Sequence, residues 1–379
     1  MPVLDKGTRA EALYAQLTAQ LREHIANGTL PPGSRVPTEL ELARNYQVSR
    51  GTVRQAIAAL VNDGLLERTR GRGTFVRVLP AANTALSPAD RQIGVILTHP
   101  GSELDLQALF GIENAARARG YHAVFTFTDE SMEQQTQEIA RLRAGRVAGM
   151  IIFPIRDLDY DESIWRLKQE EFPFVLVDRY FPGLDSDYAT SDNFGGGYRA
   201  AEHLIILGHT RIGFVHAATG TLKTTSVRDR WEGYRAALHQ YGLPYDESLL
   251  FAEFQAGPGE SREAFGDLFT RSDRPTALIA STDSLAVTLM QAIQRRGLRV
   301  PDDVALVAFD NCQISAGLNP PLTTVAQAFV DIGQQAGNLL INRIEGQAGP
   351  PKHIEVPTNL IIRESCGVRL HVRALSRSK

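Results

Sequence analysis

The sequence predicts an α/β protein in which a small N-terminal domain of helices and a hairpin precedes a two-lobed body built on parallel sheets. Three observations support this fold class. The first 78 residues carry apolar residues at helical spacing and end in a Gly-rich hairpin pattern. From residue 92 onward, short apolar runs alternate with amphipathic segments. The 379 residues, 43% of them hydrophobic, are enough for two or three domains with their own cores.

The formal net charge of −3 conceals an uneven distribution along the chain. Residues 1–78 contain 11 Lys and Arg and 7 Asp and Glu, a balance of +4, whereas the remainder carries −7. A basic N-terminal domain on an acidic body favours a polyanionic partner for that domain alone.

Cys312 and Cys366 are the only cysteines, they lie far apart in the sequence, and they belong to no metal-ligand pattern. We therefore expect two buried thiols and neither a metal nor a cofactor. The N-terminal segment lacks the apolar stretch of a secretion signal, and no run of 18 apolar residues occurs. These features predict a cytoplasmic protein without membrane association.

Helical spacing defines the first two elements of the N-terminal domain. One helix ends near residues 27–28 and has a face formed by Leu13, Leu17, Leu21 and Ile25. After a PPG turn, Thr38 and Glu41 have the spacing of a capping box, which predicts a second, short helix.

A third helix and a hairpin complete this domain. Ser49 is placed to cap the helix, whose inner face is formed by Val53, Ile57 and Leu60. The segment LLERTRGRGTFVRV then predicts two short strands around Gly71 and Gly73, which permit the positive φ of a tight turn. Three helices followed by a basic hairpin predict a winged helix-turn-helix.

This arrangement suits double-stranded DNA. The start of the third helix would enter the major groove, where Arg50 and Arg54, four residues apart, share one face. Each guanidinium can bind guanine bidentately or contact a phosphate. Arg70 and Arg72 at the hairpin tip suit a minor groove. The competing interpretation is a solvated basic helix with a charged hairpin.

The N-terminal segment also resembles the GntR family of bacterial regulators, on the pattern PPGxRxPTExELAxxxxVSRxTVRxAxxxLxxxGLLxxxxGxGTFV. The resemblance implies a DNA-binding domain over residues 1–78. The residues expected to contact DNA are Arg35, Thr38, Ser49, Arg50, Thr52, Arg54, Arg70, Gly71 and Arg72. Leu40 departs from the pattern, because several relatives carry Arg there, so one backbone contact is expected to be missing.

Residues 79–91, LPAANTALSPADR, have no periodicity and are predicted to be a linker. An apolar helical stripe, which a DNA-wedging hinge helix would require, is absent from this segment. We therefore expect the signal to pass through the spacing of the DNA-binding domains rather than through a folding hinge.

Residues 92–370 are predicted to form the two-lobed body. The apolar runs IGVIL, AVFTF, GMIIF, FVLVD, IGFVH, ALIAS and VALVAF are separated by amphipathic segments of helical length, which favours parallel sheets with helices on both faces. We expect lobe 1 to comprise about 92–187 and 326–355, and lobe 2 about 188–325 and 356–370.

Ligands of open α/β sheets bind outside the carboxyl ends of the strands. Polar residues at or after those ends are Asp178, Ser226, Arg230, Thr282 and Asp310. With aromatic residues Phe127, Phe153, Tyr180, Phe181 and Trp231 between them, they suit a polyol, because carboxylate and guanidinium groups hold vicinal hydroxyls. Taken singly, an Asp at a strand end is more often a helix cap or a loop anchor, and an Arg at a helix start such as Arg230 is also consistent with a surface residue.

The body resembles the LacI/GalR family over about 275 residues, on the segments VLVDR, DNFGGGYRAAEHLIxLGHxRIGF, ASTDSLA, VALVAFDN, PPLTTV and LIIRES. The resemblance implies a sensor domain with the fold of periplasmic sugar-binding proteins. The residues expected to bind the effector are Asp178, Ser226, Arg230, Thr282, Asp310, Phe153, Phe127 and Trp231. Thr282 stands where relatives often have Asn, which leaves the ligand's identity open.

A GntR-type head on a LacI-type body is similar to the arabinose-responsive repressors of Gram-positive bacteria. The resemblance implies a homodimer that binds a pseudopalindromic operator and is released by a sugar, with L-arabinose or a related pentose favoured. A different sugar, a purine, or activation by the ligand stay open as alternatives. A solute-binding protein or an enzyme is less consistent, because no secretion signal, GxGxxG, GxSxG or HExxH pattern is present.

Overall fold

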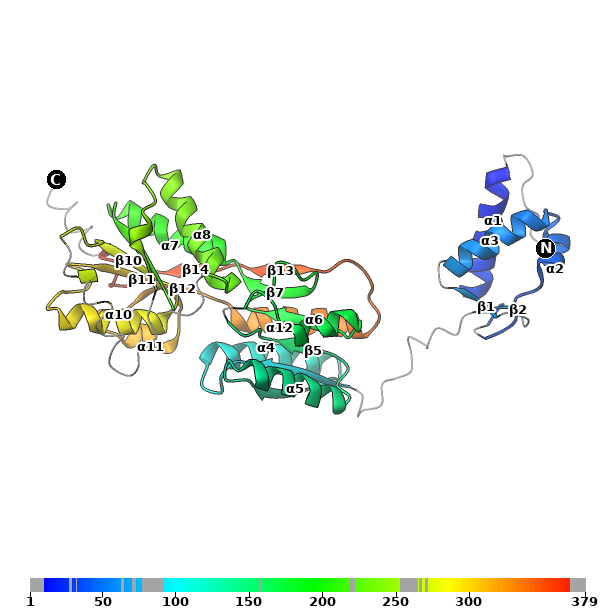
Figure 1. Ribbon diagram of the computed structural model, residues 1–379, viewed down its shortest axis with the longest axis horizontal. Coiled ribbons are helices and arrows are strands. Elements are labelled where there is room, and N and C mark those ends of the chain that lie inside the picture. The colour runs from blue at the N-terminus through cyan, green and yellow to red at the C-terminus, as the bar shows by residue number, and fades with distance from the viewer. Residues whose placement is uncertain are drawn as a thin grey trace. The chain divides into compact units, whose positions relative to one another are not determined.

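The structure is a computed structural model that describes residues 10–26, 29–31, 33–62, 65–69, 73–76, 91–156, 158–217, 222–252, 265, 268–269 and 272–368. The chain forms two compact units, residues 1–86 and 87–379, which are described separately (Figure 1). The linker predicted at 79–91 lies outside the described residues except for its last position. No helix among the described residues is long and apolar enough to cross a membrane.

The first unit contains the three predicted helices and the predicted hairpin. Their bounds are α1 (Ala10–Ala26), α2 (Glu39–Tyr46), α3 (Arg50–Asn62), β1 (Leu66–Thr69) and β2 (Gly73–Val76). The two strands pair in antiparallel register from Leu66 opposite Val76. The predicted inner faces are buried, with Leu17, Val53 and Leu60 fully shielded from solvent, so one small core holds all five elements together.

Both predicted helix caps are present. The Thr38 hydroxyl accepts a hydrogen bond from the Glu41 backbone N–H at 3.3 Å, and the Glu41 carboxylate accepts one from the Thr38 N–H at 2.7 Å. Ser49 Oγ accepts the Thr52 backbone N–H at 3.1 Å at the start of α3. Each bond satisfies an N–H group that the helix itself leaves without a partner.

The second unit contains two six-stranded sheets. The first has the order β13-β7-β6-β5-β3-β4 and consists entirely of parallel pairs. Its strands are β3 (Gln92–Leu97), β4 (His122–Phe127), β5 (Met150–Ile152), β6 (Phe174–Val177), β7 (Asp187–Ser191) and β13 (His353–Val356). Strands β3, β5 and β6 are buried on both faces, as their continuous apolar runs predict.

The second sheet has the order β14-β12-β11-β10-β8-β9, parallel except where β14 pairs with β12. Its strands are β8 (Ile212–His216), β9 (Leu250–Ala252), β10 (Ala277–Ala280), β11 (Ala305–Asp310), β12 (Thr323–Ala326) and β14 (Asn359–Ile361). All seven apolar runs singled out in the sequence are strands. Strand β7 runs from Asp187 to Ser191 and pairs with β6 in the first sheet, so it begins at the position where the sequence predicted the end of the first segment of lobe 1. The exact boundaries of the two lobes remain a prediction.

Helices cover the sheets. They are α4 (Glu103–Ala118), α5 (Met132–Ala144), α6 (Glu162–Gln169) and α12 (Phe329–Ile344) at the first sheet, and α7 (Asn193–Ile206), α8 (Thr225–Gln240), α10 (Asp283–Arg295) and α11 (Gln313–Gly317) at the second. Figure 1 shows α4 beside α12 and α7 beside α8. Cys366 is buried as predicted, whereas Cys312 is only half-buried.

Glycines permit the close approach of α7 and α8. A Cβ atom on Gly197 would lie 1.9 Å from the backbone carbonyl oxygen of Arg230, and one on Gly233 would lie 2.0 Å from that of Phe194. No side chain can occupy either position without moving a backbone. This packing fixes the position of α8, which carries three of the predicted effector-binding residues.

Candidate functional site

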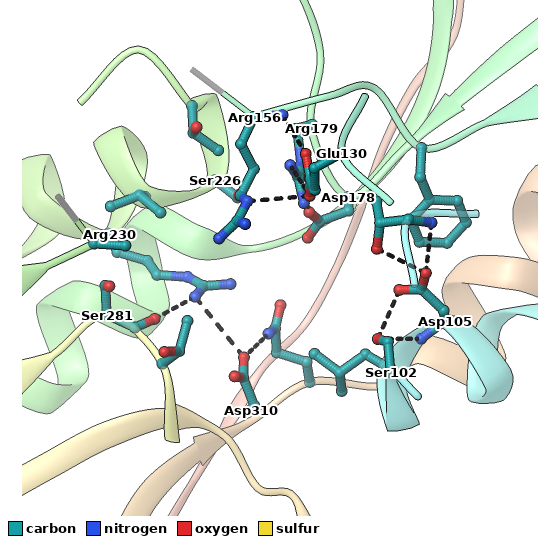
Figure 2. A pocket seen from close by; sticks show the side chains of 18 of the residues that line it. Ser102, Asp105, Glu130, Arg156, Asp178, Arg179, Ser226, Arg230, Ser281 and Asp310 are labelled. Carbon is teal, nitrogen blue, oxygen red and sulfur yellow. Dashed lines mark hydrogen bonds and ion pairs between the residues drawn. The ribbon is translucent and has the colours of Figure 1, made fainter. Parts of the chain in front are cut away.

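A cavity of about 210 Å³ lies between the two sheets of the second unit, at the carboxyl ends of strands from both. Six of the residues predicted to bind an effector line it: Phe153, Asp178, Ser226, Arg230, Thr282 and Asp310. Figure 2 shows Arg230, Ser281 and Asp310 on one side of the cavity and Arg156, Arg179, Glu130 and Asp178 on another. The cavity therefore occurs where the topology of open α/β sheets predicts a ligand.

Arg230 is held rigidly at the cavity wall. It lies one turn into α8 with a relative exposure of 3%. Its Nε donates to Asn193 Oδ1 at 2.8 Å, its Nη1 donates to the Ser281 carbonyl at 2.6 Å, and its guanidinium stacks 4.5 Å from the centre of the Phe309 ring. A guanidinium positioned this way can donate to ligand oxygens with little loss of side-chain entropy.

Asp310 lies opposite Arg230, at the end of β11, with a relative exposure of 8%. Its Oδ1 accepts a hydrogen bond from Gln327 Nε2 at 2.7 Å and is 3.9 Å from Arg230 Nη1. Burial raises the pKa of Asp310 to about 7, although the positive charge of Arg230 opposes this. The carboxylate can accept hydroxyl hydrogens when ionised, and its charge state is sensitive to pH near neutrality.

Left-handed backbone conformations gather around this cavity. Residues with positive φ occur after β4, after β6 and at the end of β11: Asp129 (48°), Glu130 (56°), Asp178 (70°), Asp310 (118°) and Asn311 (58°). Residues other than glycine rarely adopt this region of backbone conformation, because it costs free energy that favourable contacts in the surrounding structure must offset. Such conformations gather at binding and catalytic sites, and three of these residues, Glu130, Asp178 and Asp310, line the cavity.

A chain of alternating charges lines the first-sheet side of the cavity. Arg179 Nε donates to Asp178 Oδ2 at 2.9 Å, and Arg179 Nη1 is 3.5 Å from Glu130 Oε1. Arg156 Nε is 3.0 Å from the same Glu130 oxygen, and the Arg156 backbone N–H donates to Glu130 Oε2 at 2.8 Å. Glu130 thus joins the loops that follow β4, β5 and β6.

Thr282 and Asp283 have unequal roles. Thr282 lines the cavity, but its hydroxyl also caps α10 by accepting the Leu285 N–H at 3.2 Å. Asp283 is fully buried, accepts hydrogen bonds from the Cys312 N–H at 2.9 Å and the Thr324 hydroxyl at 2.6 Å, and also bonds to Ser315. Burial raises the Asp283 pKa. Asp283 is therefore an anchor between loops.

Four of the five aromatic residues expected at the site do not line the cavity: Phe127, Tyr180, Phe181 and Trp231. Phe127 ends the edge strand β4 and packs edge-on against Phe125, with ring centres 5.9 Å apart. Trp231 follows Arg230 by one residue, which turns it about 100° around α8, and it packs against Tyr245 with ring centres 6.1 Å apart. Phe153 is the aromatic residue from the predicted set that lines the cavity.

Several lining residues were missed in the sequence: Thr98, His99, Asp105, Glu130, Arg156, Arg179, His216, Gln327 and Phe329. Thr98 and Gln327 directly follow strands and His216 ends β8, whereas Glu130, Arg156 and Arg179 lie two to four residues beyond a strand. Arg179 adjoins Asp178 in the VLVDR segment, whereas Glu130 and Arg156 become adjacent only when the sheet forms.

In the first unit, α3 presents an exposed basic face. Arg50 and Arg54 are both exposed. Arg54 is restrained by Glu39, with Nη2 3.2 Å from Oε2, and the same carboxylate is 3.5 Å from Arg68 Nη2 on β1. The start of α3 and the beginning of the wing therefore share one charged cluster that includes an acidic residue.

Four of the other predicted DNA-binding residues, Arg35, Thr38, Ser49 and Thr52, belong to the described part of this unit. Thr38, Ser49 and Thr52 are exposed or half-buried and take part in the helix caps already described. The Arg35 side chain lies against Gly73 at the start of β2. Arg70, Gly71 and Arg72 lie outside the described residues.

Comparison with known proteins agrees with the two-unit organisation. Residues 13–76 match the model of the bacterial regulatory proteins of the gntR family, and residues 201–366 match the periplasmic binding protein-like domain. A transcriptional regulator of Bacillus subtilis, DegA, is 32% identical over 67% of this chain and 74% of that protein. The arabinose metabolism transcriptional repressor of Geobacillus stearothermophilus is 29% identical over 88% of this chain and 91% of that protein.

Solved structures extend this agreement to the fold of the body. A regulatory protein of the LacI family from Chloroflexus aggregans is 28% identical, covers 73% of this chain and 98% of its own, and has a TM-score of 0.64. The fold, the two matched domains and these relatives define a ligand-responsive transcription regulator and not an enzyme. The chain belongs to the LacI/GalR family of transcriptional regulators and carries a GntR-type DNA-binding domain at its N-terminal end.

Proposed function

We propose that this protein is a cytoplasmic transcriptional repressor whose affinity for an operator is lowered by a small sugar. The observation that carries the proposal is the cavity between the two sheets, where Arg230 and Asp310 face each other from α8 and β11. A ligand in this position contacts both lobes, so its binding favours one arrangement of the lobes over others. The exposed basic helix α3 on the same chain is the proposed DNA-binding element whose affinity for the operator responds to the ligand.

The DNA-binding half of the proposal rests on α3 and the wing. Arg50, Thr52 and Arg54 at the start of α3 are the proposed readers of base edges and phosphates, with Arg35, Thr38, Ser49 and the wing tip in support. Recognition of a pseudopalindrome requires two copies of this domain, so we propose a homodimer joined through the sensor bodies. Ligand binding would alter the spacing of the two heads, and a coupling of about 1–3 kcal/mol would change DNA affinity about 5–150-fold.

L-arabinose or a related pentose is the favoured effector. Two relatives that span 88% and 94% of this chain, from Geobacillus stearothermophilus and Halalkalibacterium halodurans, are arabinose metabolism repressors. The lining supplies paired carboxylate and guanidinium groups for vicinal hydroxyls and few aromatic faces, namely Phe153 and Phe329. This composition favours a polyol over a purine, although PurR of Aliivibrio salmonicida is 29% identical over 73% of this chain.

The proposal is tested in two steps on the full chain. First, thermal unfolding is followed with pentoses, hexoses, disaccharides and purine bases; a ligand at 100 times its Kd adds about 2.7 kcal/mol of stability. Second, an operator is selected from a random DNA library, and binding is footprinted with and without the effector. Stabilisation by a pentose with loss of the footprint supports the proposal. Stabilisation by purines alone contradicts the sugar assignment, and a footprint strengthened by the ligand contradicts repression.

A further inference from the structure

The first-sheet side of the cavity contains four charged side chains that neutralise one another. Arg156 and Arg179 both lie against Glu130, and Arg179 also hydrogen-bonds Asp178. The side chains of Glu130, Asp178 and Arg179 are only 12–14% exposed, so solvent screens these pairs weakly. Figure 2 shows the four groups together at one wall of the cavity.

Glu130 balances the second guanidinium charge in this group of four. Without its carboxylate, Arg156 would lose this ion pair and Arg179 would keep the one to Asp178. A further carboxylate on this side of the cleft keeps its negative charge but is hydrogen-bonded by neutral donors. That carboxylate belongs to Asp105. Its Oδ2 accepts hydrogen bonds from the backbone N–H and the hydroxyl of Thr98, at 2.7 Å each, and from the His99 N–H at 3.1 Å. Its Oδ1 accepts a hydrogen bond from the Ser102 hydroxyl at 2.8 Å.

The backbone of Glu130 indicates that its position is under constraint. Both Glu130 and the preceding Asp129 have positive φ, which is uncommon for a glutamate. The turn is held by the Asp129 N–H, which donates to the Thr98 carbonyl at 2.8 Å. The strained turn directs the Glu130 carboxylate back over the loop after β5, where it binds the Arg156 backbone.

From this geometry we infer that Glu130 sets the charge selectivity of the effector site: its carboxylate forms ion pairs with Arg156 at 3.0 Å and Arg179 at 3.5 Å, so the cleft accepts a neutral sugar and rejects an acidic one. The inference rests on the proposed function and specifies the class of sugar. An acidic ligand would place its carboxylate beside Glu130 and Asp178, and it would lose hydration without gaining an unpaired cation. A neutral sugar can use the same guanidinium N–H groups as donors without displacing a carboxylate.

The test uses sugars matched in shape. L-arabinose, D-galactose and D-galacturonate share the configuration of their pyranose rings and carry hydrogen, hydroxymethyl and carboxylate at the same carbon. D-xylose, D-glucose and D-glucuronate form a second such series, and L-arabinonate supplies a five-carbon acid. Affinities are measured by calorimetric titration of the full-length protein at pH 8, above the pKa of about 7 of Asp310, so that the opposite wall keeps a constant charge.

For the wild-type chain we expect the neutral sugar to bind at least tenfold more tightly than its acidic partner. Glu130→Gln preserves the size of the side chain and removes its charge; we expect the ratio of acidic to neutral affinity to rise about tenfold. Glu130→Gln/Arg156→Gln removes one charge of each sign, and the ratio should return toward the wild-type value. Glu133→Gln is the matched control, since Glu133 is exposed at the start of α5 and does not line the cavity.

The outcomes separate this inference from the proposed function. Tighter binding of the acid by the wild-type chain, or an unchanged ratio in Glu130→Gln, overturns the inference and leaves the sugar proposal standing. A chain that bound no member of either series and no pentonate would overturn the sugar proposal, and the inference with it. Operator binding by Glu130→Gln without ligand should equal that of the wild type, because the DNA-binding domain is a separate unit.

Discussion

The guanidinium of Arg230 and the carboxylate of Asp310 are 3.9 Å apart and almost completely buried, yet they share no hydrogen bond. Each is held by other partners, Arg230 by Asn193 and the Ser281 carbonyl, Asp310 by Gln327. An ion pair held at this separation leaves room for ligand oxygens to bind both groups at once. The relationship explains how a ligand could draw together elements from different parts of the second sheet.

The raised pKa of Asp310 predicts a pH dependence of effector binding. The pKa of Asp310 in the folded chain, about 7, lies above the ordinary aspartate value of 3.8, so between these pH values the folded state retains a proton that the unfolded state releases. The contribution of Asp310 to stability is therefore present below about pH 4 and is lost as the pH rises through 7. If the ionised carboxylate accepts a sugar hydroxyl, affinity should rise about tenfold from pH 6 to pH 8.

Calorimetric titration at several pH values checks this prediction. Asp310→Asn should bind weakly at every pH and lose the dependence, because the amide does not titrate. A wild-type affinity that stayed constant from pH 6 to pH 8 would show that the charge of Asp310 does not control binding.

Arg230→Ala should separate ligand binding from DNA binding. Loss of charge-assisted hydrogen bonds worth about 1.5–3 kcal/mol each should weaken the effector at least a hundredfold. The change also leaves Asn193 and Asp310 without this partner, so the melting temperature of the body should fall. Operator binding should persist and no longer respond to the effector.

Arg235→Ala is the control for that variant. Arg235 lies on the same helix, α8, but packs outside the cavity over Trp231, 4.6 Å from its ring centre. It should lose little effector affinity. Simultaneous loss of operator and effector binding in Arg230→Ala would indicate misfolding and would remove the assignment of Arg230.

Arg54→Ala should weaken operator binding and leave effector affinity unchanged. Arg54 is exposed on α3, and its contact with Glu39 restrains the guanidinium near the start of the helix. Loss of a base contact would cost about 1–3 kcal/mol of binding free energy and relax specificity at one position of the operator. Loss of a phosphate contact would lower the slope of log affinity against log salt concentration by about one. Fluorescence anisotropy at several salt concentrations distinguishes these outcomes. Arg22→Ala, on the exposed side of α1, is the control, and an equal loss in both variants would point to a general charge effect.

The fold was predictable where local pattern and burial coincide. Central parallel strands are apolar throughout because both faces are covered, so β3, β6 and β11 are evident in the sequence. The missed strands are polar or very short: β7 reads DYATS, β12 reads TTVA, and β9 and β14 have three residues each. Their pairing depends on tertiary neighbours, which local sequence does not encode.

The site was predictable in part for a related reason. The strand-end rule places Asp178 and Asp310 at the cleft without knowledge of the fold. Phe127 and Trp231 do not line the cavity, because residue type alone does not give the direction of a side chain. Glu130 and Arg156 are 26 positions apart and meet only through the parallel order of β4, β3 and β5.

Gly197→Ala should affect the effector site from a distance. A Cβ at this position would lie 1.9 Å from the Arg230 carbonyl oxygen, and only a shift of α7 or α8 can relieve this contact. Overpacking of this kind costs about 1–3 kcal/mol or more, which corresponds to a fall of about 2–12 °C in the melting temperature of a unit this size. Because Asn193 on α7 binds Arg230 on α8, the same shift should weaken the effector.

Gly317→Ala is the matched control, since no heavy atom lies within 4 Å of the added Cβ at the end of α11. Its melting temperature should stay within about 1–2 °C of wild type, as expected for a surface change below about 0.5 kcal/mol. Both variants should bind the operator, because the DNA-binding domain forms its own compact unit. Equal stability and equal effector affinity for Gly197→Ala and Gly317→Ala would contradict the close packing of α7 on α8 and its role in placing Arg230.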